Sequence, residues 1–339
     1  MNRASAPDRR VRRALMAVVV AVLAAASLVL SAQENQLRLV STAWPPFTNE
    51  PGKPRFALDL VEAALTRIGL GGTTTIVDAA QFTHALLYGE FDGSAAAWKD
   101  AERERFMIFS QPYLENRLIL VGRKGADVSA ATLAALKGKR VAVVGGYSYG
   151  DFGSDGPTQV KSLGEEDSLT LLLGGKADYA LMDELVVEYL TEHYADQAQS
   201  KLQIGSTPLL TRPLYLAIRR TRPDAESIVN RFNAQLRNMI ADHTYHRLLH
   251  VTWIRADIDG DGVAEYVPSS DRAGRDAPQH AYTILSGPDN SQPPPAQSRF
   301  LIGGNIYVNW ASVPESYKDP NPSFPDSARS TASIFSFTW

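Results

Sequence analysis

Between about residues 37 and 254 the sequence alternates short strand-like runs with longer helix-like runs, and this order restricts the fold more than any other feature. Such alternation is typical of an α/β fold with largely parallel sheets. Residues 56–70 illustrate the helical runs, because their apolar side chains recur on one face and glycines follow at 69 and 71. The expected strands cover residues 37–40, 140–144, 177–182 and 214–218, and the further expected helices cover residues 184–194 and 223 to about 253.

The composition changes after residue 254. Half of the 20 prolines lie in residues 255–339, among Ser, Asn and Gly clusters and without a helical period. We therefore expect a loop-rich C-terminal extension, with a stiff Pro-rich linker at residues 288–298. Residues 300–310 and 333–339 alternate apolar and polar side chains, so a small β-element is expected to dock on the main body.

The N-terminus has the layout of an export signal. Five arginines precede an uninterrupted apolar run over residues 14–30, as in the charged and apolar regions of such signals. Residues 1–32 are therefore expected to direct export. Leu30 stands where a small side chain is preferred before cleavage after Ala32, so both a cleaved signal peptide and an uncleaved membrane anchor stay open.

Charge and cysteine content exclude several classes of protein. With 34 Lys and Arg against 37 Asp and Glu the formal net charge is −3, which argues against a nucleic-acid partner. The chain has no Cys, so disulfides, thiolate catalysis and thiolate zinc sites are excluded. No phosphate loop, nucleotide fingerprint or Ser/His/Asp arrangement is recognisable. No cofactor is therefore required by the sequence.

An acidic loop over residues 257–265 (DIDGDGVAE) is the second chemical signal. Asp257, Asp259 and Asp261 are spaced by two and precede a glycine, and Glu265 occupies the ninth position, so their oxygens suit Ca²⁺. The twelfth position is Pro268 in place of a bidentate Glu, which excludes a complete helix-loop-helix site. Two interpretations stay open: a structural Ca²⁺ site, or an acidic Gly-rich turn without an ion.

Seven runs carry a resemblance to a known family. They are TAWPPFT (42–48), RFALDL (55–60), GEFDGSAAAWKDAERERFMIFSQPY (89–113), KGKRVAVVGGYS (137–148), LLLGGKADYALMDELVVEYL (171–190), PLYLAIRR (213–220) and ADHTYHRLLHVTW (241–253). In order and spacing they resemble the periplasmic solute-binding proteins of family 3, the polar amino-acid receptors of ABC importers. The resemblance implies a periplasmic location.

The resemblance also implies a two-lobed periplasmic-binding-protein-like fold of type II, in which hinge closure traps a ligand between the lobes. Lobe 1 would comprise residues 33–115 plus 213–254, and lobe 2 residues 116–212. The two crossing strands would fall just after Tyr113 and between residues 206 and 212.

Four positions correspond to ligand-binding positions of the family. The resemblance implies that Arg103 binds the ligand α-carboxylate, Ser148 supports it with a hydroxyl, Asp183 holds the α-ammonium and Trp44 stacks on the ligand. An arginine suits this role because its planar fork makes two parallel hydrogen bonds to a carboxylate. Each residue also has a purely structural interpretation, since Arg103 lies in a charged run, Asp183 can cap a helix, Ser148 lies in a turn and Trp44 can pack in a core.

The sequence departs from the family at one run. Where the family usually has Ser-x-Thr-x-x-Arg, Trp98 and Asp100 replace the two hydroxyl residues. Asp100 would compete for the guanidinium of Arg103 and repel a ligand carboxylate by about 1 kcal/mol or more. Trp98 and Trp44 are expected to form an aromatic clamp that, together with Asp100 and Asp183, favours a cationic ligand.

The function implied by the resemblance is capture of a small polar, amino-acid-like or amine-bearing solute, with an ABC transporter permease or other inner-membrane protein as partner. This interpretation predicts no enzyme activity. One alternative is a cyclohexadienyl-dehydratase-like enzyme on the same scaffold, with Asp100 or Asp183 as the carboxylic acid. Another is a membrane-tethered sensing or adaptor module, held by residues 14–30, whose C-terminal β-element contacts an envelope protein.

Overall fold

A computed structural model describes most of the chain after the N-terminal segment. The described residues are 36–193, 195–249, 251–278, 281–284 and 295–318. The expected signal or anchor, the expected strand at 333–339 and most of the expected linker lie outside them. Among the described helices, none combines the length and apolar character needed to cross a membrane.

The main body is built on one ten-stranded sheet with the order β2-β1-β3-β10-β5-β8-β6-β7, in which β4 pairs with β10 and β9 with β5. Its strands are β1 (Gln36–Thr42), β2 (Gly71–Val77), β3 (Gly93–Trp98), β4 (Met107–Phe109), β5 (Leu114–Arg123), β6 (Arg140–Val144), β7 (Thr158–Ser162), β8 (Tyr179–Asp183), β9 (Leu202–Ile204) and β10 (Leu210–Arg219). Its helices are α2 (Phe56–Arg67), α3 (Ala79–Tyr88), α4 (Arg103–Phe106), α5 (Glu165–Leu173), α6 (Glu184–His193), α7 (Ala195–Lys201), α8 (Ala225–Ala241) and α9 (Thr244–Leu249), with a 3₁₀ turn at Leu133–Leu136.

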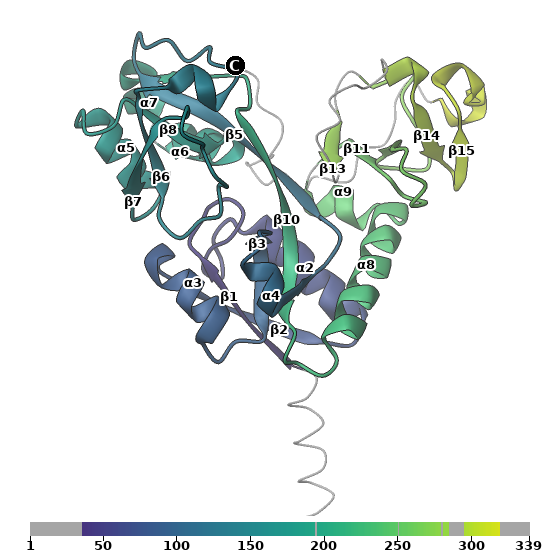
Figure 1. The fold of residues 1–339 in the computed structure, drawn as a ribbon. Coiled ribbons are helices and arrows are strands. Elements are labelled where there is room, and N and C mark those ends of the chain that lie inside the picture. Colours follow the sequence, from purple (N-terminus) through teal and green to yellow (C-terminus); the bar gives the residue numbers. More distant parts are fainter. Residues whose placement is uncertain (1–35, 194, 250, 279–280, 285–294, 319–339) are drawn as a thin grey trace, which may run out of the picture.

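Two long strands, β5 and β10, run from one lobe to the other (Figure 1). They pair antiparallel, with Leu210 opposite Leu118 and Leu214 opposite Leu114. The strands β1 to β4 lie with α2, α3, α4 and α8 in the first lobe, and β6 to β8 lie with α5, α6 and α7 in the second (Figure 1). The expected α/β class and two-lobed fold are therefore confirmed.

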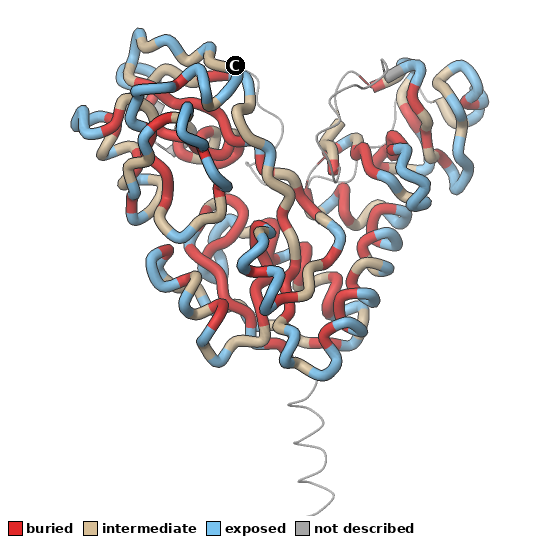
Figure 2. The backbone as a smooth tube through the Cα atoms, in the orientation of Figure 1, coloured by how far each residue is buried: buried red, intermediate tan, exposed pale blue. Residues whose placement is uncertain are grey.

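Apolar side chains spaced at three and four residues explain why the helices form and which face they bury. In α2, Phe56, Leu60 and Ala64 are buried, as are four neighbouring apolar residues. Gly69 follows at φ +75°, a left-handed conformation in which glycine has no steric penalty, and the chain turns there into β2. Figure 2 shows the buried backbone concentrated within each lobe.

The long helix expected over residues 223–253 is wrong in one respect, because the structure contains two helices, α8 and α9. His243 between them has φ +61°, which breaks the helical path. The side chain of Asp242 accepts a hydrogen bond from the N–H of Thr244 at 3.0 Å and so starts the second helix. The break turns α9 toward the C-terminal extension.

The C-terminal extension is more regular than its composition predicts. It forms a five-stranded sheet of order β13-β11-β12-β14-β15, made of β11 (Trp253–Ala256), β12 (Glu265–Pro268), β13 (Tyr282–Ile284), β14 (Arg299–Ile302) and β15 (Asn305–Tyr307). Three 3₁₀ turns flank the last strands, at Pro295–Gln297, Trp310–Ser312 and Glu315–Tyr317. A small apolar core around Phe300 supports this sheet.

The extension contacts the body close to the crossing strand β5. The hydroxyl of Tyr282 accepts a hydrogen bond from the Glu115 N–H at 3.0 Å and lies 3.3 Å from the Glu115 carbonyl. On α9, the buried His246 donates from Nε2 to the Val267 carbonyl at 3.0 Å, and burial lowers its pKa to about 4. His246 is therefore a neutral packing residue, and the extension is fixed to the outer side of the hinge.

Candidate functional site

An aromatic cluster joins the two lobes where a ligand cleft is expected. Trp44 follows β1, Trp98 ends β3, and Tyr147 and Tyr149 follow β6. The rings of Trp44, Trp98 and Tyr147 lie with their centroids 5.6 Å apart in each pair, in edge-to-face contact. The ring planes of Trp44 and Trp98 lie at 88° to each other and the rings are in contact. A clamp would instead hold two parallel rings on either side of a ligand.

Arg103 bridges the lobes from the start of α4. Its side chain is buried, and it donates from Nη1 to the Trp98 carbonyl at 2.9 Å and from Nη2 to the Gly146 carbonyl of the other lobe at 3.0 Å. Its Nε lies 3.5 Å from Oδ2 of Asp100. Burial lowers the pKa of Arg103, and the charge of Asp100 offsets part of this effect. In this closed arrangement Arg103 is held by protein oxygens.

Asp100 links Arg103 to the predicted hydroxyl residue. Its Oδ1 accepts a hydrogen bond from the Arg103 N–H at 2.8 Å, and its Oδ2 accepts one from the Ser148 hydroxyl. Partial burial alone would raise the pKa of Asp100, but these hydrogen bonds and the Arg103 charge outweigh it and lower the pKa below its ordinary value. Asp100 is therefore an ionised partner of Arg103 and Ser148.

A second arginine, not expected from the sequence, reaches the same point. Arg212 on β10 donates to the Ser148 carbonyl, and its guanidinium lies 5.8 Å from the centre of the Trp98 ring. Asp100 is the largest stabilising charge for Arg212 as well as for Arg103. Two guanidinium groups therefore depend chiefly on one carboxylate at the lobe junction.

Asp183 is buried at the end of β8, next to the cluster. Its Oδ1 accepts a hydrogen bond from the Leu185 N–H at 2.8 Å and caps α6, and its Oδ2 accepts one from the Arg117 N–H of β5 at 3.1 Å. Burial raises the pKa of Asp183 well above its ordinary value, although these hydrogen bonds oppose the effect. Asn116 connects this region to the cluster, because its Oδ1 accepts from Trp98 Nε1 at 2.7 Å.

Glu165 at the start of α5 is a further acid that the sequence analysis missed. Burial raises its pKa to about 8, with the nearby Trp44 indole N–H opposing the rise. Even so, Trp44 Nε1 and Glu165 Oε2 have no hydrogen-bond partner among the described residues, and the same holds for Asn116 Nδ2.

The cavity between the lobes is small in this structure. Its volume is about 20 Å³, which holds roughly one water molecule. Four predicted residues, Trp44, Trp98, Arg103 and Ser148, line it, whereas Asp100 and Asp183 do not. The remaining lining residues are Phe82, Ala96, Tyr147 and Leu214. A solute of amino-acid size can enter only when the lobes separate or the aromatic rings turn.

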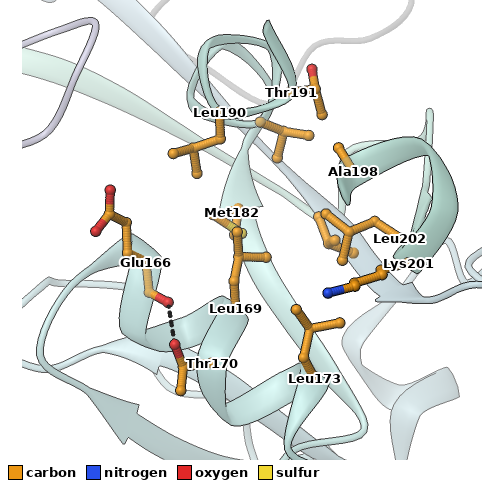
Figure 3. A pocket seen from close by; sticks show the side chains of 12 residues that line it. Glu166, Leu169, Thr170, Leu173, Met182, Leu190, Thr191, Ala198, Lys201 and Leu202 are labelled. Atoms are coloured by element: carbon orange, nitrogen blue, oxygen red, sulfur yellow. Dashed lines mark hydrogen bonds between the residues drawn. The ribbon is translucent and has the colours of Figure 1, made fainter. Parts of the chain in front are cut away.

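A larger pocket lies elsewhere, in the second lobe between α5, α6 and α7 (Figure 3). Its volume is about 240 Å³, and Leu169, Leu173, Met182 and Leu190 make its wall mostly apolar. None of the residues predicted to bind ligand lines this pocket. The polar and charged groups that suit a polar solute gather at the lobe junction instead.

Comparisons with known proteins agree with this architecture. The sequence profile of the bacterial extracellular solute-binding proteins, family 3, matches residues 38–255. This match covers more than half of the chain, and the protein therefore belongs to that family. A search of the curated proteins finds no match.

Several solved structures share the fold. An ancestral arginine-binding protein bound to arginine is 25% identical, with a TM-score of 0.54, over 64% of this chain and 97% of that chain. A mutant of ArgBP from T. maritima is 25% identical, with a TM-score of 0.53, over 64% of this chain and 95% of that chain. The ancestral amino acid-binding protein AncCDT-1, a precursor of cyclohexadienyl dehydratase, is 23% identical, with a TM-score of 0.52, over 66% and 98% of the two chains, and shows likeness of fold alone.

Proposed function

We propose that this protein is an exported, periplasmic receptor that captures a small amino-acid-like solute between its lobes and presents the closed form to an ABC permease. The observation that carries the proposal is the charge at the lobe junction, where the carboxylate of Asp100 is the main stabilising charge for both Arg103 and Arg212. A ligand carboxylate would balance the second guanidinium. Arginine-binding structures at 25% identity support the same class of ligand.

The two lobes offer different groups to such a ligand. Arg212 makes one hydrogen bond among the described residues, and a guanidinium has five N–H donors, so it can receive a carboxylate. Glu165 and Asp183 are the acids available to an ammonium group, because a nearby positive charge favours their ionised forms. The proposed ligand is thus zwitterionic, whereas the aromatic residues with Asp100 and Asp183 led to the expectation of a cationic ligand. Closure follows because the ligand binds better to the closed state.

Calorimetric titration, guided by a thermal-shift screen of amino acids, amines and opines, tests the proposal. We expect Arg212→Ala to weaken binding of the best ligand by roughly 2–3 kcal/mol, and Asp183→Ala by roughly 2–4 kcal/mol, because each removes the partner of a desolvated charge. The exposed neighbour Arg105→Ala is the matched control and should bind as the wild type does. If no compound stabilises the protein, or if both variants bind normally, the receptor proposal fails.

A dehydratase on this scaffold would need a protonated carboxylic acid facing its substrate. Asp100 does not suit this role because its pKa is lowered, and the two backbone hydrogen bonds of Asp183 occupy both of its oxygens. Glu165, with a pKa of about 8, is the better candidate for a general acid at the lobe junction. Product formation from a prephenate-like substrate, abolished in Glu165→Gln, would favour the enzyme over the receptor.

A further inference from the structure

The hairpin loop between β11 and β12 gathers four carboxylates at one corner of the extension. Three of them, Asp257, Asp259 and Asp261, are exposed and alternate along the loop. The N–H groups of Gly260 and Gly262 donate to Asp257 at 2.8 and 3.0 Å and fix its orientation. Oxygens of Asp257, Asp259 and Glu265 approach within 4.8 Å of one another, which is close enough to share one ion.

Glu265 supplies an observation that is independent of the exposed aspartates. It is the first residue of β12 and is fully buried, with 0% of its surface exposed. Its Oε2 accepts a hydrogen bond from the Ile258 N–H at 3.0 Å, whereas its Oε1 is buried without a hydrogen-bond partner. A fully buried carboxylate oxygen is thus directed into the loop without a hydrogen bond, and its charged partner is Arg299.

One side chain partly compensates the loop. Nη1 of Arg299, on β14, lies 2.5 Å from Asp261 Oδ2. Its Nη2 lies 2.9 Å from Asp259 Oδ2. The same Nη2 lies 2.9 Å from Glu265 Oε1 but does not reach hydrogen-bond geometry with it. Three of the four carboxylates therefore pair with one guanidinium, and the loop keeps an excess of negative charge.

We propose that this loop binds one Ca²⁺ ion through Asp257, Asp259 and Glu265, and that Arg299 competes with the ion for the same oxygens. All the available ligands are oxygens and most are anionic, which suits a hard cation and disfavours zinc or copper. Asp261 is the fourth ligand, released for the ion when Arg299 turns away. The ion thus takes the place of the Arg299 guanidinium, which is shared among several carboxylates.

The site lies where its occupancy stabilises the junction between extension and body. The loop joins β11 to β12, Arg299 belongs to β14, and β11 pairs with β13, which carries Tyr282 to the crossing strand β5. Binding at the loop therefore stabilises the three strands that hold the extension together. This role is structural and does not depend on the solute that the cleft captures.

Titration of the chelator-treated full-length protein with Ca²⁺, followed by calorimetry and by terbium luminescence, tests the proposal. We expect one ion per chain, at least tenfold weaker binding in Asp259→Asn, and tighter binding in Arg299→Gln because the competitor is gone. Asp271→Asn removes an exposed carboxylate of the extension that faces His243 and should leave binding unchanged.

Two outcomes overturn the proposal: no saturable Ca²⁺ binding at millimolar concentration, or equal binding in wild type and Asp259→Asn. Weaker binding in Arg299→Gln would equally contradict the competition. Circular dichroism of each variant shows whether it folds, and Asp257→Asn serves as the second loop variant if Asp259→Asn does not. Titration with Mg²⁺ should show much weaker binding, because Mg²⁺ demands a stricter octahedral geometry.

Discussion

The lobe junction and the acidic loop of the extension have opposite charge imbalances. At the junction, the charge of Asp100 acts on both Arg103 and Arg212, whereas in the loop the three carboxylates of Asp259, Asp261 and Glu265 pair with the guanidinium of Arg299. Guanidinium groups outnumber their main carboxylate partner at the first place, and carboxylates outnumber their cation at the second. The comparison teaches that the ratio of positive to negative groups in a cluster decides which ion it can bind, because a buried charge needs a partner of opposite sign.

Arg103→Ala is expected to have the largest effect on stability of the substitutions that test this comparison. It leaves the carbonyls of Trp98 and Gly146 without donors and Asp100 without its buried counter-charge. We expect a loss of roughly 3–5 kcal/mol in the free energy of unfolding, measured by urea denaturation. Arg105→Ala, at an exposed position of the same helix, should cost less than about 0.5 kcal/mol. Equal losses in the two variants would show that Arg103 does not join the lobes.

The pH dependence of stability sharpens the description of the junction. The pKa of Glu165 is raised to about 8 from an ordinary 4.5, so its neutral form stabilises the folded state below pH 4.5 and this contribution is lost as pH rises through 8. From pH 5 to pH 9 the wild type should lose on the order of 3 kcal/mol relative to Glu165→Gln. The difference in the free energy of unfolding between the wild type and the exposed-site variant Glu90→Gln should not change with pH. A flat difference for Glu165→Gln as well would place its carboxylate in water.

Arg299→Gln tests the loop side of the comparison. Removing the one cation leaves the loop carboxylates to repel each other, and we expect a loss of roughly 1–2 kcal/mol in the free energy of unfolding at low salt without calcium. Added NaCl should reduce the loss by screening the carboxylates. Arg275→Gln, on an exposed segment of the extension, should have no comparable salt dependence. A loss that salt does not change would point to packing rather than charge.

Tyr282→Phe has the smallest expected effect and tests the connection between the two regions. It removes the hydroxyl that contacts both backbone groups of Glu115, and we expect a loss of about 1 kcal/mol. Thermal denaturation of the full chain measures it, and Tyr88→Phe, 66% exposed on α3, is the control. If the two variants unfold at the same temperature, the extension is not held to the hinge by this hydroxyl.

The order of strands and helices could be predicted because local periodicity and turn residues determine it. The runs around β1, α2, β6 and β8 show their pattern within ten residues, and the seven family runs give the two lobes. The helix break at His243 was missed because one residue at positive φ leaves the apolar period on either side intact. The sheet of the extension was underestimated because strands of three or four residues are too short to show alternation.

The candidate site was predicted less completely than the fold. Arg103, Ser148 and Trp44 were predicted from the family register and Trp98 from a departure from it, and the structure brings all four to one small cavity. That they bind a ligand stays a prediction. Arg212 and Glu165 were missed because their meaning comes from neighbours far along the chain: Arg212 meets Ser148 across 64 residues. A side chain whose role depends on long-range contacts gives no local signal.

The hydroxyl of Tyr282 holds the beginning of β5 from outside, at the N–H and the C=O of one residue. A strand that bends there when the lobes move must carry the extension along, or break this attachment. The position of the extension is therefore coupled to the backbone of β5 at Glu115.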